Sequence, residues 1–169
     1  MITVQVASTS WWFLPVVTPI AIWAAWSDLA RMRIPNLAVL ALIAVTLPLG
    51  FLALPAEEWL FRLINAPVVL AIGFVFFAAG AMGAGDAKYA AAAAPLFDRQ
   101  DLPLILVLTT ATLLAGFTLH RTIRRIPALR RQMPDWHSWE RKEFPMGLVI
   151  SGVILFYLLI VGIYGQKNA

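Results

Sequence analysis

Residues 83–88, with the sequence Gly83-Ala84-Gly85-Asp86-Ala87-Lys88, place a carboxylate and an ammonium group between two long apolar runs. Residues 74–81 precede this segment, and residues 90–96 follow it. Ionisable groups at the end of a membrane span are costly, so their presence there indicates function. The two glycines leave room for a second backbone or a substrate to come close. Asp86 could equally be an ordinary helix N-cap, so this residue alone decides nothing.

The composition indicates a membrane protein. Of the 169 residues, 61% are hydrophobic and only 13% are charged, whereas a soluble domain has about 25% charged residues. The apolar residues also cluster in long runs, which is typical of several membrane-spanning helices. We therefore expect an all-α polytopic membrane protein that forms one membrane-embedded domain, residues 1–169.

The same composition excludes several kinds of chemistry. The chain has no cysteine, which excludes disulfides, thiolate zinc sites and a cysteine nucleophile. His120 and His137 show no metal-ligand spacing, and we expect neither a metal nor a cofactor. The net charge of +4 is concentrated in one segment between spans. Anionic lipid headgroups explain such a segment better than nucleic acid does, so membrane lipids are the expected partner.

Six apolar segments are predicted to enter or cross the membrane. Their ranges are 12–26, 37–54, 63–82, 87–97, 102–119 and 144–164, and a basic loop at 120–143 joins the last two. The fourth segment is short, because a full crossing needs about 20 residues. Whether segment 87–97 spans the membrane completely is left open.

The distribution of positive charge supports the count of six spans. With six crossings, most Lys and Arg side chains, including Arg31, Arg33 and Lys88, share one side of the membrane. The positive-inside rule makes that side cytoplasmic and places both termini outside the cytoplasm. The same arrangement puts Asp28 and Asp86 at the cytoplasmic face.

Two carboxylates at one membrane face can act as an acid–base pair. When they meet in a low-dielectric site they cannot both ionise easily, so one pKa rises and the pair holds a shared proton. One member can then take a proton from water while the other protonates a carbonyl oxygen. The sequence does not show that Asp28 and Asp86 meet.

These residues resemble the type IV prepilin peptidase family. The GxGD turn at residues 83–86, followed by Lys88, looks like the second catalytic motif of that family. Asp28, followed by two arginines and Ile34-Pro35-Asn36, looks like the first motif. Pro145-Met146-Gly147 is similar to a Pro-Tyr-Gly element of the family, with Met146 in place of the tyrosine. The resemblance covers about residues 11–164.

The resemblance implies an aspartic endopeptidase of the cytoplasmic (inner) membrane. Such enzymes remove the short basic leader of a prepilin, a single-helix membrane protein, typically just after a glycine. Asp28 and Asp86 would be the catalytic pair, supported by Gly83, Gly85 and Lys88. Further residues would contact substrate or serve structure, namely Arg31, Pro35, Asn36, Pro145 and Gly147. Larger members carry an N-methyltransferase segment, often with a cysteine-based metal motif. We expect no such segment here, as in the minimal peptidases of Flp-type (tight adherence) pili.

Two alternatives remain at this point. A presenilin-like or signal-peptide-peptidase-like intramembrane aspartic protease also uses GxGD, but Asp28 is expected in a turn and no Tyr-Asp pair occurs in a span. A non-enzymatic carrier or assembly subunit could place Asp28 and Asp86 on an ion path, although carriers usually bury charge near the bilayer midplane. No motif in the sequence indicates which pilin is cut, the cleavage preference, the oligomeric state or the role of Lys88. Because both motifs are expected in turns, we predict mobility between the two aspartates.

Overall fold

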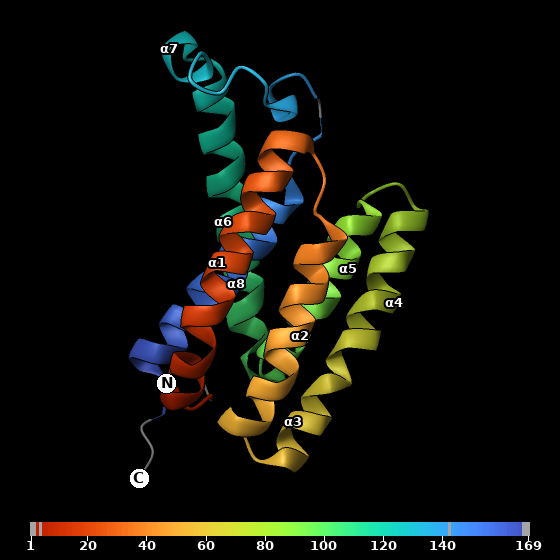
Figure 1. Cartoon of the computed structure of the whole chain (residues 1–169), viewed down its shortest axis with the longest axis vertical. Coiled ribbons are helices and arrows are strands. Elements are labelled where there is room, and N and C mark those ends of the chain that lie inside the picture. Colours follow the sequence, from red (N-terminus) through yellow and green to blue (C-terminus); the bar gives the residue numbers. More distant parts are fainter. Residues whose placement is uncertain (1–2, 4, 142, 167–169) are drawn as a thin grey trace.

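The computed structural model describes residue 3, residues 5–141 and residues 143–166. The chain is 80% helical, and within the described residues the only β-type pairing is an isolated bridge between Val6 and Gln166. The helices are α1 (Ala7–Arg31), α2 (Asn36–Ala53), α3 (Ala56–Leu63), α4 (Asn65–Ala78), α5 (Ala84–Ala93), α6 (Leu102–Arg124), α7 (Pro127–Arg130) and α8 (Met146–Tyr164) (Figure 1). Three short 3-10 turns accompany them, η1 (Ala94–Leu96), η2 (Arg99–Asp101) and η3 (His137–Trp139).

Five helical segments of the described chain are long and apolar enough to cross a membrane. They are α1, α2, the continuous pair α3–α4, η2 with α6, and α8. The prediction of an all-α polytopic membrane protein is therefore confirmed. At its centre, α1 packs along α8, and both helices present a fully buried stripe at helical spacing, with Phe13 and Val17 facing Tyr157 and Val161.

Helix α5 is the short sixth member of the bundle. Its 10 residues extend about 15 Å at the α-helical rise, about half of a hydrocarbon core. Small side chains let it pack closely against α4, because a Cβ added at Gly73 would lie only 2.8 Å from the Cβ of Ala87. Helix α5 thus lies between neighbouring helices of the bundle, namely α2, α4 and α8.

The first polar motif adopts a different local structure from the one predicted. Helix α1 does not end before Asp28 but continues to Arg31, and Met32 ends it with a positive φ of 55°. No glycine or proline occurs between Trp26 and Arg31 to stop the helix, and Pro35 restricts only the residue before it. The prediction that Asp28 lies in a turn is therefore wrong, because Asp28 belongs to the last helical turn of α1.

Other helices also begin or end outside the predicted ranges, and among them α5 begins at Ala84 instead of residue 87. The third span was expected from residue 63, yet α3 already begins at Ala56, where Pro55 precedes it and Glu57 and Glu58 favour a helix start. Trp59 anchors this helix over Gly50 of α2, where any Cβ would overlap the indole ring. Helix α6 continues past Leu119 to Arg124, so the segment that connects α6 with α8 begins after residue 124 and not at residue 120 as expected.

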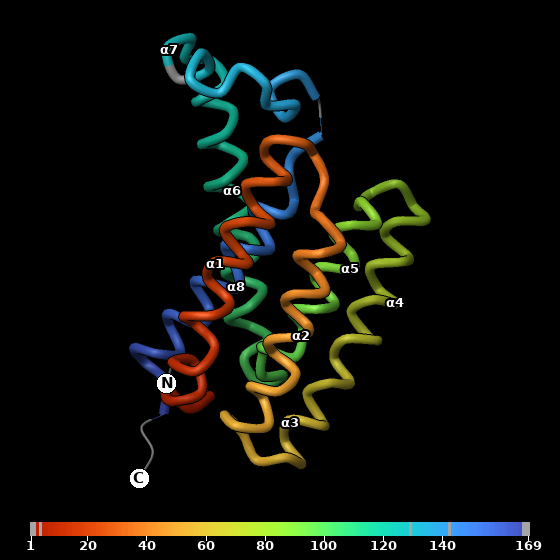
Figure 2. The backbone as a smooth tube through the Cα atoms, viewed as in Figure 1, coloured from red at the N-terminus to blue at the C-terminus, as the bar shows by residue number. Residues whose placement is uncertain are grey.

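The two ends of the described chain meet at one end of the bundle. The Ala7 amide donates to the Gln166 carbonyl at 2.9 Å, and the Gln166 amide donates to the Gln5 carbonyl at 3.1 Å. Residues around α7 lie at the opposite end, as do the α1–α2 and α4–α5 connections (Figure 2). Both ends of the described chain thus lie at the same end of the bundle.

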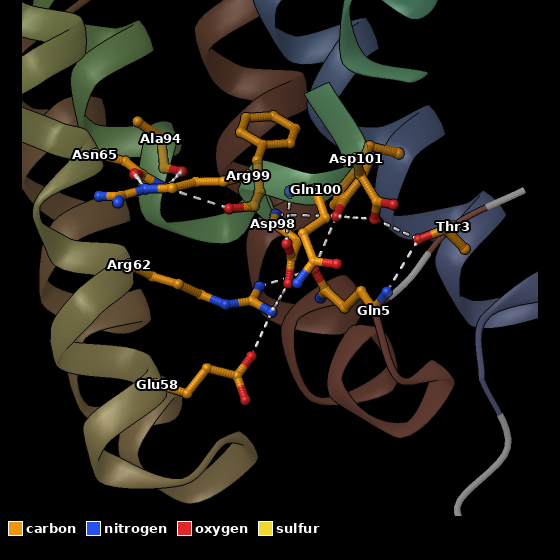
Figure 3. Close-up of polar contacts among 12 residues, drawn as sticks. Thr3, Gln5, Glu58, Arg62, Asn65, Ala94, Asp98, Arg99, Gln100 and Asp101 are labelled. Carbon is orange, nitrogen blue, oxygen red and sulfur yellow. Dashed lines mark hydrogen bonds and ion pairs between the residues drawn. The ribbon is translucent and has the colours of Figure 1, made fainter. Parts of the chain in front are cut away.

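A buried polar cluster fixes the end of the bundle where the termini lie. We define it as Thr3, Gln5, Arg62, Asp98, Asp101 and Tyr157 (Figure 3). Arg62 donates to Gln5 at 2.8 Å and to Asp98 at 2.7 Å. The Tyr157 hydroxyl lies 2.8 Å from acceptor oxygens of both Gln5 and Asp101. Because buried charges need partners, this cluster ties α3, η2 and α8 to the N-terminal segment.

Candidate active site

Asp28 is held at the end of α1 by the start of α8. Its side chain is buried, with 4% of the residue exposed, and its Oδ2 accepts a hydrogen bond of 2.7 Å from the Gly147 amide. A Cβ added at Gly147 would lie 2.9 Å from that oxygen and 2.9 Å from Cδ1 of Ile34. Only glycine therefore fits at position 147 without displacing the carboxylate.

Asp86 lies in the first turn of α5, where it also caps the helix. Its Oδ2 accepts a hydrogen bond of 3.1 Å from the Gly83 amide, and a Cβ at Gly83 would lie 2.8 Å from the same oxygen. Burial raises the pKa of the Asp86 carboxyl, and the Gly83 amide offsets only part of that effect. The N-cap interpretation is thus wrong in position, because Gly83 is the N-cap residue of α5 and Asp86 is the third residue of the helix, whose carboxylate accepts from the N-cap amide. The same carboxylate also lines a cavity.

Asp28 and Asp86 share one cavity of about 780 Å³. The end of α1, residues 32–34 and Asn36 form one wall, and the turn from Gly80 to Asp86 forms the other. Both carboxylates line this one space, and like charges that share a space of low dielectric constant repel one another. The fold therefore brings together the two aspartates that the sequence singles out from distant segments.

Other residues singled out by the sequence also lie around this cavity. Gly83, Gly85, Asn36 and Lys88 line it. Gly85 packs against Ile34, but a Cβ there would make only ordinary contact at 3.8 Å, so the space does not demand glycine at position 85 as it does at Gly147.

Four further residues from the sequence motifs do not line the cavity. One of them, Gly147, acts through its hydrogen bond to Asp28. Arg31 points to a separate surface pocket that it shares with Trp26 and Trp136. Pro35 and Pro145 act on the backbone instead, since each stands at the N-cap of a helix, α2 and α8 respectively.

Sequence reasoning missed the contribution of the segment between α6 and α8. Arg141, Glu143 and Phe144 line the cavity beside Met146, which the sequence motif had already singled out. Their position next to Pro145-Met146-Gly147 was the one available signal. Within the described parts of the chain no group of three or more His, Asp or Glu side chains is placed to hold a metal ion.

Fold and site together define a multi-pass helical membrane protein with two carboxylates in one cavity at the end of its bundle. The model of the type IV leader peptidase family matches residues 16–119. The chain belongs to the type IV leader peptidase family, and it is accordingly a membrane-spanning protease. The match contains both Asp28 and Asp86 and ends before Gly147. No curated protein and no solved structure matches the chain.

Proposed function

We propose that this protein is an aspartic endopeptidase of the cytoplasmic (inner) membrane that removes the short basic leader of prepilin-like proteins, in particular Flp-type prepilins. The observation that carries the proposal is the shared cavity of Asp28 and Asp86. The family match supports leader peptidase activity, and the geometry supports the aspartic mechanism.

The surroundings of the pair favour a single shared proton near neutral pH. Asp28 and Asp86 repel one another, and burial disfavours the charged form of Asp86. One amide donor on each carboxylate, from Gly147 and Gly83, fixes its orientation without neutralising it. The proton belongs to the pair rather than to one residue, as in other interacting carboxylates.

A pair in this state can hydrolyse a peptide bond. The ionised carboxylate takes a proton from water as the water oxygen attacks the peptide carbonyl carbon, while the protonated carboxyl donates to the carbonyl oxygen. A proton then passes to the peptide nitrogen, the C–N bond breaks, and the carboxylic acid and amine are released. After this cycle the pair again holds one proton.

The position of the cavity supports a cytoplasmic reaction. The α1–α2 and α4–α5 connections, whose residues line the cavity, lie at the end of the bundle away from the two termini (Figure 1). Six of the ten arginines of the chain lie between residues 121 and 141, in the last turn of α6 and in the segment after it, at this same end, and positive residues favour the cytoplasmic side. This location also disfavours a carrier, whose charges would lie near the midplane of the membrane.

The test is co-expression of the protein with a tagged Flp-type prepilin. Wild type should shorten the pilin, whereas Asp28→Asn and Asp86→Asn should leave it full length at normal abundance of each variant. Asp135→Asn, a carboxylate on the exposed surface outside the cavity, is the matched control and should cleave like wild type. Shortening of the pilin by both cavity variants would refute the aspartate pair.

A further inference from the structure

A second cavity lies beside the carboxylate cavity, on the outer surface of the helix bundle. It measures about 590 Å³ and runs as an apolar groove between α2 and α4. One stripe of α2, from Val39 to Leu47, forms one wall, and Ala66 to Leu70 of α4 form the other. Ala91 and Ala92 of α5 form its floor.

The sequence of α5 explains why the groove exists. Helices α2 and α4 both pack against α5 but scarcely touch each other. The face of α5 between them carries alanines, and these side chains are too short to fill the space. Small residues at such a face also allow another helix to approach closely.

The groove is open to the surroundings of the bundle and suits an apolar occupant. Its wall residues Leu40, Ile43 and Leu70 are 60%, 42% and 44% exposed. The Thr46 hydroxyl already donates to the Leu42 carbonyl at 2.7 Å, so its hydrogen needs no hydrogen-bond acceptor from a molecule in the groove. From Asn36 to Leu47 the wall is about 16 Å long at the helical rise, which corresponds to three turns of a docked helix.

The groove and the carboxylate cavity lie next to each other. Asn36 and Lys88 line both of them. The junction is thus polar, the space on one side holds the two aspartates, and the space on the other side is apolar. A chain that passes through the junction would have its polar part beside Asp28 and Asp86 and its apolar part in the groove.

We propose that the groove holds the first turns of the substrate's apolar helix, directly after the bond to be cut, while the leader lies in the carboxylate cavity. This inference rests on the proposed function and adds to it a docking site for the mature part of the substrate. The order of the two spaces matches the order of a basic leader followed by a membrane helix. A lipid acyl chain would fill the groove alone and would not need the polar junction.

Asn36 is suited to the junction because a substrate helix has unpaired backbone groups at its start. The first four amides of a helix have no internal partner. Asn36 is exposed and its side-chain oxygen can accept from such an amide. The backbone between the leader and the first turn would then be held extended, as hydrolysis requires.

Cysteine cross-linking tests the groove directly, because the chain has no cysteine of its own. The probe is a tagged Flp-type prepilin with one cysteine in the first two turns of its apolar helix, bound to an Asp86→Asn background that leaves it uncut. Ile43→Cys in the groove should cross-link at least fivefold more than Ala44→Cys. Ala44 lies at the same depth on α2, is exposed and does not line the groove.

The second measurement is prepilin cleavage by a variant in which a larger side chain fills the groove. Ala66→Trp should reduce cleavage of the prepilin at least tenfold, whereas Val68→Trp, on the exposed side of the same helix, should cleave like wild type. Abundance and thermal stability of both variants verify that they fold. If wild type cleaves while both pairs of variants behave alike, the groove is not the docking site although the protease function stands. If wild type cleaves no prepilin, the proposed function fails, and the docking site with it.

Discussion

The Gly147 amide donates a hydrogen bond of 2.7 Å to Oδ2 of Asp28 across a sequence separation of 119 residues. The contact joins the first turn of α8 to the last turn of α1, the two helices that form the centre of the bundle. The Asp28 carboxylate is therefore positioned by a neighbouring helix, α8, and not by residues of its own segment. Asp86, by contrast, is held by the Gly83 amide within its own turn.

Replacement of Gly147 by alanine should inactivate the protein without preventing its insertion. The added Cβ would meet both Asp28 and Ile34 at 2.9 Å, and overpacking of this kind costs about 1–3 kcal/mol. Relief of the clash must move Asp28, so we expect at least a tenfold loss of prepilin cleavage in membranes. Gly162→Ala on the same helix is the control, since its Cβ would meet only the exposed Trp11 side chain, at 3.3 Å. Equal activity of both variants would contradict the positioning role of Gly147.

Removal of the Asp86 charge should stabilise the protein at neutral pH. Burial raises the pKa of this carboxyl in the folded state. Ionisation of Asp86 therefore destabilises the folded protein. This loss of stability is absent below the pKa of the unfolded chain and grows as the pH rises through the pKa of the folded state. Asn retains the ability to cap α5. Asp86→Asn should therefore melt a few degrees higher than wild type near pH 7.5, and the difference should vanish towards pH 4.

The measurement is thermal unfolding of the detergent-solubilised protein over this pH range. Asp135→Asn is the control and should follow the wild-type curve, because Asp135 lies on the exposed surface. A difference between Asp86→Asn and wild type that grew on acidification would mean that ionised Asp86 stabilises the fold.

The polar cluster at the other end of the bundle should affect stability alone (Figure 3). Arg62 is buried between Glu58 and Asp98, and removal of one partner from a buried ion pair costs about 3–5 kcal/mol. Arg62→Ala should thus lower the melting temperature strongly, while the molecules that remain folded cleave prepilin at the wild-type rate. Glu58→Gln, whose carboxylate is 43% exposed, should cost less than about 1 kcal/mol. Loss of cleavage in folded Arg62→Ala would instead show coupling between the two ends.

Local patterns in the sequence predicted the helical membrane fold and the residues around the cavity. The GxGD turn is a local signal, because Gly83, Asp86 and the α5 start interact within four residues. The contact between Gly147 and Asp28 could not be read in this way, since it depends on how α1 packs along α8. The same holds for Trp59, whose place over Gly50 fixes α3 where a loop was expected. Arg141 and Glu143 reach the cavity through the path of a segment with little hydrophobic periodicity, so only their position just before Pro145 could have indicated them.

The different anchoring of the two aspartates predicts which of them moves. Asp28 is fixed by α8, whereas Asp86 sits behind an exposed turn in which Gly80 has a φ of 72°. Spin labels at Ile22 on α1 and Ala81 in that turn should give a broad distance distribution in the free protein. An uncleaved prepilin bound to the Asp86→Asn variant should narrow it. A control pair at Ile22 and Phe156, both exposed on the central helices, should not change. Identical narrow distributions with and without prepilin would show that the two aspartates are preassembled, because the turn that carries Asp86 would then already hold its bound position.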